Sequence, residues 1–356
     1  MPRVTLQTIA DRVGVSRMTV SNAFSRPDQL SATLRERILA AAREVGYVGP
    51  DPAGRALARG TTGAVGILLT ESLEQAFTDA VATSFLGAIA EELAPTGLAL
   101  TLLSSSGTGE VVPARDVAID GALVYSCDPT SPAVDWLLRR RLPLVFVDQA
   151  PVDDIASVNV ADRLGARSAA QHIVDLGHRR VGLLMSGLHP PHGIIEDPYQ
   201  LIDGHASRQR MLGWFDALHP AGIRPTIVRQ SYARIEEVFR GARLLLDGPD
   251  RPTAVLCFSD AIAYGVIQAA GELGIRVPED LSVVGFDDNP LAIRIRPALT
   301  TVAQDVKAKG RAAAAALTLA IEHARTGTVG EVDHVLLPTE LIIRDSTRPP
   351  AASRRR

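Results

Sequence analysis

Four side chains near the N-terminus have the chemistry needed to read base edges in duplex DNA. Arg17, Met18, Ser21 and Asn22 fall within one short stretch, SRMTVSNAF. Arginine can pair bidentately with guanine and asparagine with adenine, while methionine can contact the methyl group of thymine. These residue types predict base contacts, provided that a helix presents them on one exposed side.

The surrounding stretch, residues 5–26, has the pattern of two short helices joined by a glycine turn. An apolar face with helical spacing is formed by Leu6, Ile9, Ala10 and Val13. Thr5 can cap this helix, and Gly14 can end it because glycine accepts positive φ. Ser16 can cap the second helix, which in a helix-turn-helix enters the major groove. A small helical hairpin that binds no nucleic acid also fits this pattern.

Further motifs follow in an order that is typical of one family. They are Val15-Ser16, Thr19-Val20-Ser21, Gly46-Tyr47, Pro50-Asp51 and Leu57. With them, residues 4–60 resemble the headpiece of the lactose-repressor (LacI/GalR) family of bacterial transcription regulators, with a third helix over residues 31–45. Capping by Ser31 or Thr33 is expected for that helix. The DNA-binding residues predicted from pattern and resemblance are Thr5, Ser16, Arg17, Met18, Thr19, Ser21, Asn22, Ser31, Arg55 and Leu57.

Residues 50–60, PDPAGRALARG, predict a short hinge helix. Asp51 suits its N-cap, Pro52 its first position and Gly60 its end. Two turns that contain Gly54 are too few to hold in water, so we expect this helix to fold only on DNA. A flexible linker is the alternative. The resemblance implies that two hinge helices pair in the minor groove, where Leu57 wedges between bases.

Charge is divided unevenly along the chain. Residues 1–60 contain nine arginines and five acidic residues, for a net charge of +4, which leaves −7 on the remainder. A basic module on an acidic body favours one surface that meets phosphates while the rest stays off DNA.

Composition and cysteine placement bound the class of protein. A chain of 356 residues is long enough for two or three domains. Its apolar runs are too short for a membrane span, and no signal-peptide pattern is present, so we expect a cytoplasmic protein. Cys127 and Cys257 lie in apolar runs, which favours buried thiols over a disulfide; a reactive thiol is the minor alternative.

Strand and helix patterns alternate from Ala64 onward. Apolar strand-like runs are residues 64–69, 98–103, 121–126, 143–148, 180–185, 253–258 and 281–286. Helical stretches fall near residues 79–94, 132–141, 162–176, 205–219, 234–247, 260–273 and 304–325, before a final strand at 333–343. This alternation predicts parallel, doubly wound sheets in two α/β lobes. The resemblance implies the fold of periplasmic sugar-binding proteins.

The predicted domain organisation is as follows. An all-α helix-turn-helix headpiece occupies residues 1–49, a hinge 50–61, an effector-binding domain 62–346, and a disordered tail 347–356. Within the effector-binding domain, the N-lobe takes residues 62–161 and 304–328, and the C-lobe takes residues 162–303 and 329–346.

Acidic residues directly follow three predicted strands, where ligands bind in open α/β sheets. These are Asp148, Asp260 and Asp287, and Arg210 lies at a helix start. Carboxylates accept hydroxyl hydrogens and arginine donates in a fork, so the set suits a polyhydroxylated ligand such as a sugar. A helix cap or an inter-lobe salt bridge is the other interpretation for each carboxylate.

The resemblance assigns effector contacts residue by residue. It implies Asp148, Arg210, Ser259, Asp287 and Gln304, with Thr70 and Phe77 less surely placed. Ser259-Asp260 stands where the family has Asn-Asp, and Phe77 fits a core position nearly as well. No cofactor and no metal are expected: phosphate-binding glycine loops are missing, and His189 and His192 flank two prolines without a carboxylate or cysteine cluster.

We therefore predict a transcriptional regulator of the repressor type. It would bind a pseudo-palindromic DNA operator as a homodimer or a higher oligomer, under control of a sugar effector, with no membrane partner. Two alternatives come from other classes. A solute-binding protein would need an export signal and no headpiece, and an enzyme with an appended DNA-binding domain would need a nucleophile or cofactor motif.

Overall fold

The chain forms two compact units, Met1–Gly63 and Ala64–Arg356. The computed structural model describes residues 4–49, 51–69, 73–105, 112–126, 131–187, 191–200, 204–231, 235–328 and 330–351. No helix among these residues is both long and apolar enough to cross a membrane. Each unit is described on its own below.

The first unit is built from helices. They are α1 (Leu6–Val13), α2 (Arg17–Ser25), the 3-10 turn η1 (Pro27–Gln29), α3 (Ala32–Glu44) and α4 (Pro52–Arg59). A small core of Ile9, Ala10, Val20, Ala23, Ile38, Ala41 and Ala42 holds α1, α2 and α3 together. This is the predicted helix-turn-helix with its third helix.

Each of these helices begins at a side chain that accepts a backbone hydrogen bond. Thr5 caps α1, Ser16 caps α2 and Ser31, rather than Thr33, caps α3. Gly14 ends α1 with φ 78°, in the left-handed region that favours glycine. The sequence therefore predicts these ends correctly, because caps act between residues that are close along the chain.

Gly49 has a structural role. Its φ is +122°, and a Cβ there would lie 3.3 Å from Cδ1 of the Phe24 ring. Phe24 in turn packs edge-on against Tyr47, with ring centroids 5.7 Å apart. A side chain at residue 49 would meet both backbone strain and the Phe24 ring.

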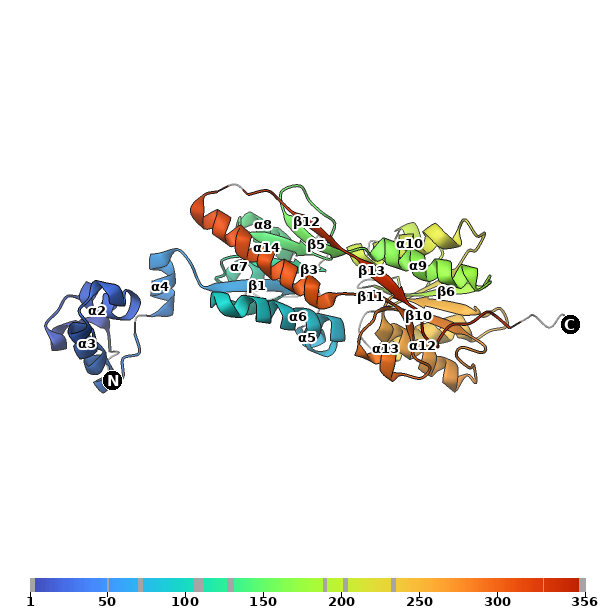
Figure 1. Cartoon of the computed structure of the whole chain (residues 1–356), viewed down its shortest axis with the longest axis horizontal. Coiled ribbons are helices and arrows are strands. Elements are labelled where there is room, and N and C mark those ends of the chain that lie inside the picture. The colour runs from blue at the N-terminus through green and yellow to red at the C-terminus, as the bar shows by residue number, and fades with distance from the viewer. Residues whose placement is uncertain are drawn as a thin grey trace. The chain divides into compact units, whose positions relative to one another are not determined.

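The second unit contains two lobes, each with its own sheet (Figure 1). We call N-lobe the six-stranded parallel sheet with the helices packed on it. Its strands are β1 (Ala64–Leu69), β2 (Ala99–Ser104), β3 (Ala122–Tyr125), β4 (Leu144–Val147), β5 (Ala156–Val160) and β12 (His334–Leu337), in the order β12-β5-β4-β3-β1-β2. Its helices are α5 (Leu73–Thr78), α6 (Ala80–Leu93), η2 (Ala94–Thr96), α7 (Pro113–Asp116), α8 (Pro132–Arg139) and α14 (Val306–Thr326).

We call C-lobe the seven-stranded sheet with its helices. Its strands are β6 (Val181–Gly187), β7 (Gly193–Ile194), β8 (Thr226–Ser231), β9 (Ala254–Cys257), β10 (Ser282–Asp287), β11 (Thr300–Gln304) and β13 (Thr339–Ile342). Their order is β13-β11-β10-β9-β6-β8-β7, with β13 and β7 antiparallel to their neighbours. Its helices are α9 (Asp162–Asp175), η3 (Pro198–Gln200), α10 (His205–Leu218), α11 (Ile235–Leu246), α12 (Asp260–Glu272) and α13 (Pro290–Arg294).

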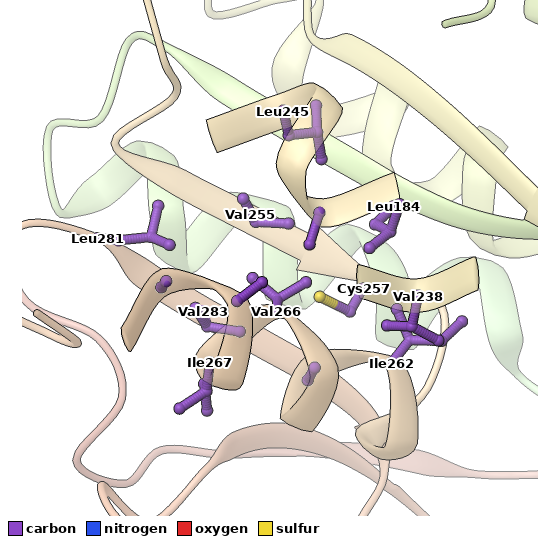
Figure 2. Close-up of a cluster of buried hydrophobic side chains, with 14 of the residues drawn as sticks. Leu184, Val238, Leu245, Val255, Cys257, Ile262, Val266, Ile267, Leu281 and Val283 are labelled. Carbon is purple, nitrogen blue, oxygen red and sulfur yellow. The ribbon is translucent and has the colours of Figure 1, made fainter. Parts of the chain in front are cut away.

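Helices cover both faces of each sheet, as near-continuous apolar strands require. Figure 2 shows one of the C-lobe cores, in which Val255, Cys257 and Val283 from the sheet pack against Val266 and other helical side chains. Cys257 is buried, and burial raises the pKa of its thiol well above the usual value, as expected of a packing residue. Cys127 lies outside the described residues.

Three predictions about the fold are wrong in detail. The final strand at 333–343 is two strands, because the chain passes from the N-lobe sheet to the C-lobe sheet at Pro338. Its first half, β12, pairs with β5, so His334–Leu337 belongs to the N-lobe and not to the C-lobe. The long helix and the second N-lobe segment were both expected to start at residue 304. Gln304 instead ends β11 of the C-lobe, and α14 starts two residues later.

The tail assignment also needs correction. Thr347 and Arg348 are bound to the C-lobe, although residues 347–356 were expected to be disordered. The Thr347 hydroxyl lies 3.0 Å from His172 Nε2, and the Arg348 carbonyl accepts a 3.0 Å hydrogen bond from Ser282 Oγ. Residues 352–356 lie outside the described residues.

Strands β5, β8 and β11 were not predicted. Each carries buried polar side chains, such as Asn159, Gln230 and Thr301, in place of a continuous apolar run. Hydrophobic pattern alone passes over such strands, although each of them is paired on both sides: β5 with two parallel strands, and β8 and β11 each with one parallel and one antiparallel strand.

Candidate functional site

The predicted DNA-reading face lies on α2 of the first unit. Arg17 and Met18 are exposed, and 70% of the Met18 surface is accessible. Asn22 donates a 3.0 Å hydrogen bond from Nδ2 to Gln29 Oε1, so its amide is held at the helix surface. Ser21 is half-buried.

The other predicted DNA contacts are at helix ends and on α4. Thr5, Ser16 and Ser31 act as caps, and the Thr19 hydroxyl lies 2.8 Å from Ser16 Oγ. Caps leave backbone N–H groups at a helix N-terminus, where phosphates bind. Their capping role does not by itself show DNA contact.

Helix α4 has the ends that the sequence predicts. Asp51 accepts a 2.9 Å hydrogen bond from the Ala53 N–H, and Gly60 closes the helix with φ 70°. Arg55 is exposed, and Leu57 is 87% exposed. The expectation that α4 requires DNA to fold remains a prediction.

In the second unit, buried charged and amide groups form a hydrogen-bonded and ion-paired series that we call the polar chain. Its members, in order of contact, are Asp148, Lys309, Gln304, Asp287, Arg210 and Asp162. All six are at most 8% exposed. Buried charges persist in proteins when they are paired and hydrogen-bonded, which this series achieves.

The first half of the polar chain joins the two lobes. Lys309 Nζ, from α14, lies 2.6 Å from Asp148 Oδ2 at the end of β4 and donates a 3.2 Å bond to Gln304 Oε1. Gln304 Nε2, at the end of β11, donates a 2.7 Å bond to Asp287 Oδ1. An N-lobe carboxylate is thus linked to a C-lobe carboxylate through one lysine and one amide.

The second half of the polar chain surrounds Arg210 of α10. Its Nε donates to Asp162 Oδ1 at 2.7 Å, and its Nη1 lies 3.6 Å from Asp287 Oδ1. The guanidinium carbon lies 3.6 Å from the ring centroid of Phe286 and 4.5 Å from that of Phe258. The rings exclude water and favour the cation.

Burial shifts the pKa values of these groups. It raises the pKa of Asp162 and, well above the usual value, that of Asp287, although the charge of Arg210 opposes both shifts. Burial alone would lower the pKa of Arg210, but the charges of Asp162 and Asp287 raise it. The arginine therefore stays charged, and the carboxyls hold protons more readily than exposed ones.

Two carboxylate oxygens in the polar chain have no hydrogen-bond partner among the described residues. They are Asp148 Oδ1 and Asp162 Oδ2. A buried carboxylate oxygen without a donor is costly, so such atoms mark a place where a ligand can supply hydrogens. Asp148 also has φ 53°, a strained conformation for a residue other than glycine.

The structure brings together four of the seven predicted effector contacts: Asp148, Arg210, Asp287 and Gln304. Ser259 instead caps α12, where its Oγ accepts a 3.3 Å bond from the Ile262 N–H. Phe77 is 65% exposed on α5, so the core alternative is wrong for it. Thr70 lies outside the described residues.

Asp260 is neither a helix cap nor part of an inter-lobe salt bridge; both of its carboxyl oxygens are hydrogen-bonded within the C-lobe. It is fully buried, accepts a 2.9 Å bond from the Asn289 N–H and a 2.5 Å bond from Thr301 Oγ1, and thereby holds β11 to α13. Burial raises the pKa of this carboxyl to about 7. The neighbouring Asp288 forms an ion pair with Arg344 at 2.7 Å.

Sequence reasoning missed Asp162 and Lys309. Asp162 starts α9 and looks like an ordinary acid in a first helical turn. Lys309 could have been found, because it precedes the buried Ala313 by four residues and therefore falls on the buried face of α14. His192 Nε2 lies 3.3 Å from the Gly187 carbonyl oxygen, while His189 is outside the described residues.

The fold and the site define a class of protein: helix-turn-helix regulators with a periplasmic-binding-like domain. Residues 5–49 match the model of bacterial regulatory proteins of the lacI family, and residues 170–347 match that of a periplasmic binding protein-like domain. A helix-turn-helix transcriptional regulator of Mycolicibacterium smegmatis is 36% identical over 368 residues, with 98% of each chain covered.

Two solved structures show the same arrangement over nearly the whole chain. The lac repressor dimer bound to operator and the anti-inducer ONPF has a TM-score of 0.76 at 25% identity, covering 97% of this chain and 99% of that one. The regulator CelR in complex with cellobiose has a TM-score of 0.69 at 26% identity, covering 97% and 100%. The chain belongs to the lacI family and is a helix-turn-helix transcriptional regulator with an effector-binding domain.

Proposed function

We propose that this chain is an operator-binding repressor that acts as a homodimer and responds to a sugar bound between its lobes. The proposal for the effector rests on two buried carboxylate oxygens without a hydrogen-bond partner among the described residues. They are Asp148 Oδ1 from the N-lobe and Asp162 Oδ2 from the C-lobe. A polyhydroxylated ligand would supply hydrogens to both. The structural relatives bound to cellobiose and to operator DNA support a sugar and a dimer.

The proposed contacts divide between the units. Base edges are read by Arg17, Met18, Ser21 and Asn22, phosphates are met at the capped helix ends and by Arg55, and Leu57 enters the minor groove. The proposed effector contacts are Asp148, Arg210, Asp287 and Gln304. The resemblance also implies Thr70, Phe77 and Ser259, which would have to reach the ligand when the lobes close on it. A two-fold dimer then requires a pseudo-palindromic operator.

Effector binding would act through the polar chain. A ligand that binds one arrangement of the lobes more tightly shifts the population toward it, and the hinge segments then pair more or less readily on DNA. Coupling of this kind is typically about 1–3 kcal/mol. A ligand that favours the DNA-competent arrangement acts as a corepressor, and one that favours the other acts as an inducer.

The test is operator binding with and without sugars. A duplex selected from random DNA by the full-length protein is titrated by fluorescence anisotropy at physiological salt, with ribose, glucose or cellobiose added. We expect a symmetric selected site and a change in apparent Kd of about 5–150-fold with an active sugar. A selected sequence without symmetry, or an affinity that no sugar changes, would contradict the proposal.

We assign the chain no enzymatic activity and place it with its DNA in the cytoplasm. The relatives are transcriptional regulators. Incubating the same sugars with the protein and analysing them by chromatography separates this proposal from the enzyme alternative. Consumption of a sugar at a catalytic rate would favour an enzyme with an appended DNA-binding unit.

A further inference from the structure

Lys309 is a buried lysine inside the proposed effector site. Only 1% of its surface is exposed, although lysine is almost never fully buried unless it is paired. Its ammonium lies 2.6 Å from Asp148 Oδ2 and 3.2 Å from Gln304 Oε1. Two of the proposed effector contacts are therefore held by a lysine that makes no other ion pair among the described residues.

Lys309 determines how its two partners can meet a ligand. Because it takes Oδ2 of Asp148, only Oδ1 remains without a partner. Because it donates to Oε1 of Gln304, the amide nitrogen of Gln304 turns to Asp287, to which it donates at 2.7 Å. The lysine thus fixes which oxygen and which amide hydrogen are left for a bound molecule.

Each of the two cations in the polar chain faces a carboxyl, and three carboxyls share these two cations. Lys309 faces Asp148, and Arg210 faces Asp162 at 2.7 Å with Asp287 at 3.6 Å. A cationic ligand would have to displace the Lys309 ammonium from Asp148. An anionic ligand would meet carboxylates, since both cations already have carboxylate partners. Hydroxyl groups, in contrast, can donate to the two oxygens without partners at no cost in buried charge.

We propose that Lys309 sets the charge preference of the effector site: its ammonium fills the cationic position beside Asp148 and makes the site select an uncharged polyhydroxylated ligand. The proposal rests on the effector site proposed above and narrows its ligand class. Lys309 is therefore a specificity-determining residue.

A charge-exchange experiment tests this proposal. The full-length native protein and its variants are screened by thermal shift against neutral pentoses, hexoses, disaccharides and polyols. The amino form and the phosphate ester of the same sugars, such as glucosamine and glucose 6-phosphate, are screened beside them. Because a ligand stabilises the folded state by mass action, binding raises the melting midpoint. For the native protein we expect a neutral compound to raise the midpoint by several degrees, and its charged forms to have no effect.

Two single variants should change the preference in opposite directions. Lys309→Met leaves the Asp148 carboxylate without its ammonium, so the amino sugar should now raise the midpoint more than the neutral sugar. Asp148→Asn leaves the Lys309 ammonium without its carboxylate, so the phosphate ester should gain instead. Lys307→Met is the matched control, because Lys307 is exposed two residues earlier in α14; it should keep the native preference.

A single variant that fails to fold does not end the test. The double variant Lys309→Met/Asp148→Asn removes both charges, so it leaves neither one buried and unpaired. We expect it to fold, to bind neutral compounds and to show no preference for amino sugars. Lys309→Arg keeps the positive charge and should keep the native preference.

The result that overturns the proposal is a Lys309→Met or double variant with the ligand preference of the native protein. Stabilisation of the native protein by an amino sugar or a phosphate ester, or by none of the compounds, would overturn it as well. Operator titrations with the same compounds test the proposed function separately from the role of Lys309. If the compounds change operator affinity but the preference between neutral and charged forms is the same in the native protein and in Lys309→Met, this inference fails and the proposed function stands.

Discussion

The helix-turn-helix unit and the α/β unit place the side chains that we propose for ligand contact in opposite ways. On α2 and α4, the surface carries the exposed side chains of Arg17, Met18 and Leu57. Each of these helices begins at a cap whose hydrogen bond spans three residues or fewer along the chain. In the polar chain, the groups are buried and come from six separate positions between residues 148 and 309. Substitutions on the surface of the first unit should therefore affect DNA recognition alone. Substitutions in the polar chain should affect both effector recognition and the stability of the fold.

The largest expected effect comes from removing the cation at the centre of the polar chain. Arg210→Met leaves Asp162 and Asp287 buried without their guanidinium, which should lower the free energy of unfolding by about 3–5 kcal/mol. Urea denaturation followed by circular dichroism measures this change. Arg208→Met is the control, because Arg208 is exposed on the same helix, and its effect should stay within about 0.5 kcal/mol. Equal effects of the two variants would mean that the polar chain contributes nothing to stability.

The second prediction concerns pH. Burial raises the pKa of Asp260 to about 7, above its value in the unfolded chain. The stability linked to this carboxyl is thus fully present below pH 4 and is lost as pH rises toward 7, by about 1.4 kcal/mol per pH unit. Asp260→Asn should flatten the fall in unfolding free energy between pH 4 and 7.

Asp247→Asn serves as its control, since Asp247 is exposed. Asp162 and Asp287, whose pKa values are also raised, titrate in both proteins, so the difference between Asp260→Asn and the native protein isolates Asp260. A pH profile that is the same with and without Asp260 would contradict the assignment.

A surface substitution on α2 should affect recognition alone. Arg17→Ala should lose about 1–3 kcal/mol of discrimination between the operator and variant sites, because a bidentate arginine contributes that much. The melting midpoint and the response to effector should stay as in the native protein. Competition binding against a set of single-base operator variants measures the discrimination. An effector response lost with operator discrimination intact would show that the two units are wrongly assigned.

The smallest expected effect is at the hinge. Gly54 lies within α4, and a Cβ there would meet nothing within 4 Å, so alanine fits. Gly54→Ala should favour the helix by about 1 kcal/mol. If α4 forms only on DNA, this gain appears as up to about fivefold tighter binding to operator for each of the dimer's two hinge helices. Binding unchanged by alanine, with α4 amide protons protected from exchange in the free protein, would show that the helix is already formed.

The same contrast explains how much the sequence could predict. The helix ends at Thr5, Gly14 and Ser16 follow from residues close along the chain, so pattern reasoning finds them. The alternation of apolar strands and helices likewise predicts two α/β lobes, and four residues of the polar chain are among the effector contacts that the resemblance implies.

What could not be predicted depends on contacts between distant residues. Strands β8 and β11 carry the buried polar side chains of Arg229 and Gln304, which are hydrogen-bonded to residues distant along the chain, Pro191 and Asp287. The buried position of Asp260 depends in part on Thr301, 41 residues away, which donates a hydrogen bond to its carboxyl. Lys309 stands beside Asp148 only because α14 returns to the N-lobe sheet from β11.

The most direct test of the central claim is the binding stoichiometry and selectivity of the purified full-length protein. Analytical ultracentrifugation with a labelled symmetric site, beside random duplex of equal length at physiological salt, gives both at once. The account predicts a dimer that prefers the symmetric site by about a thousandfold or more. A monomer that binds both duplexes equally would contradict it.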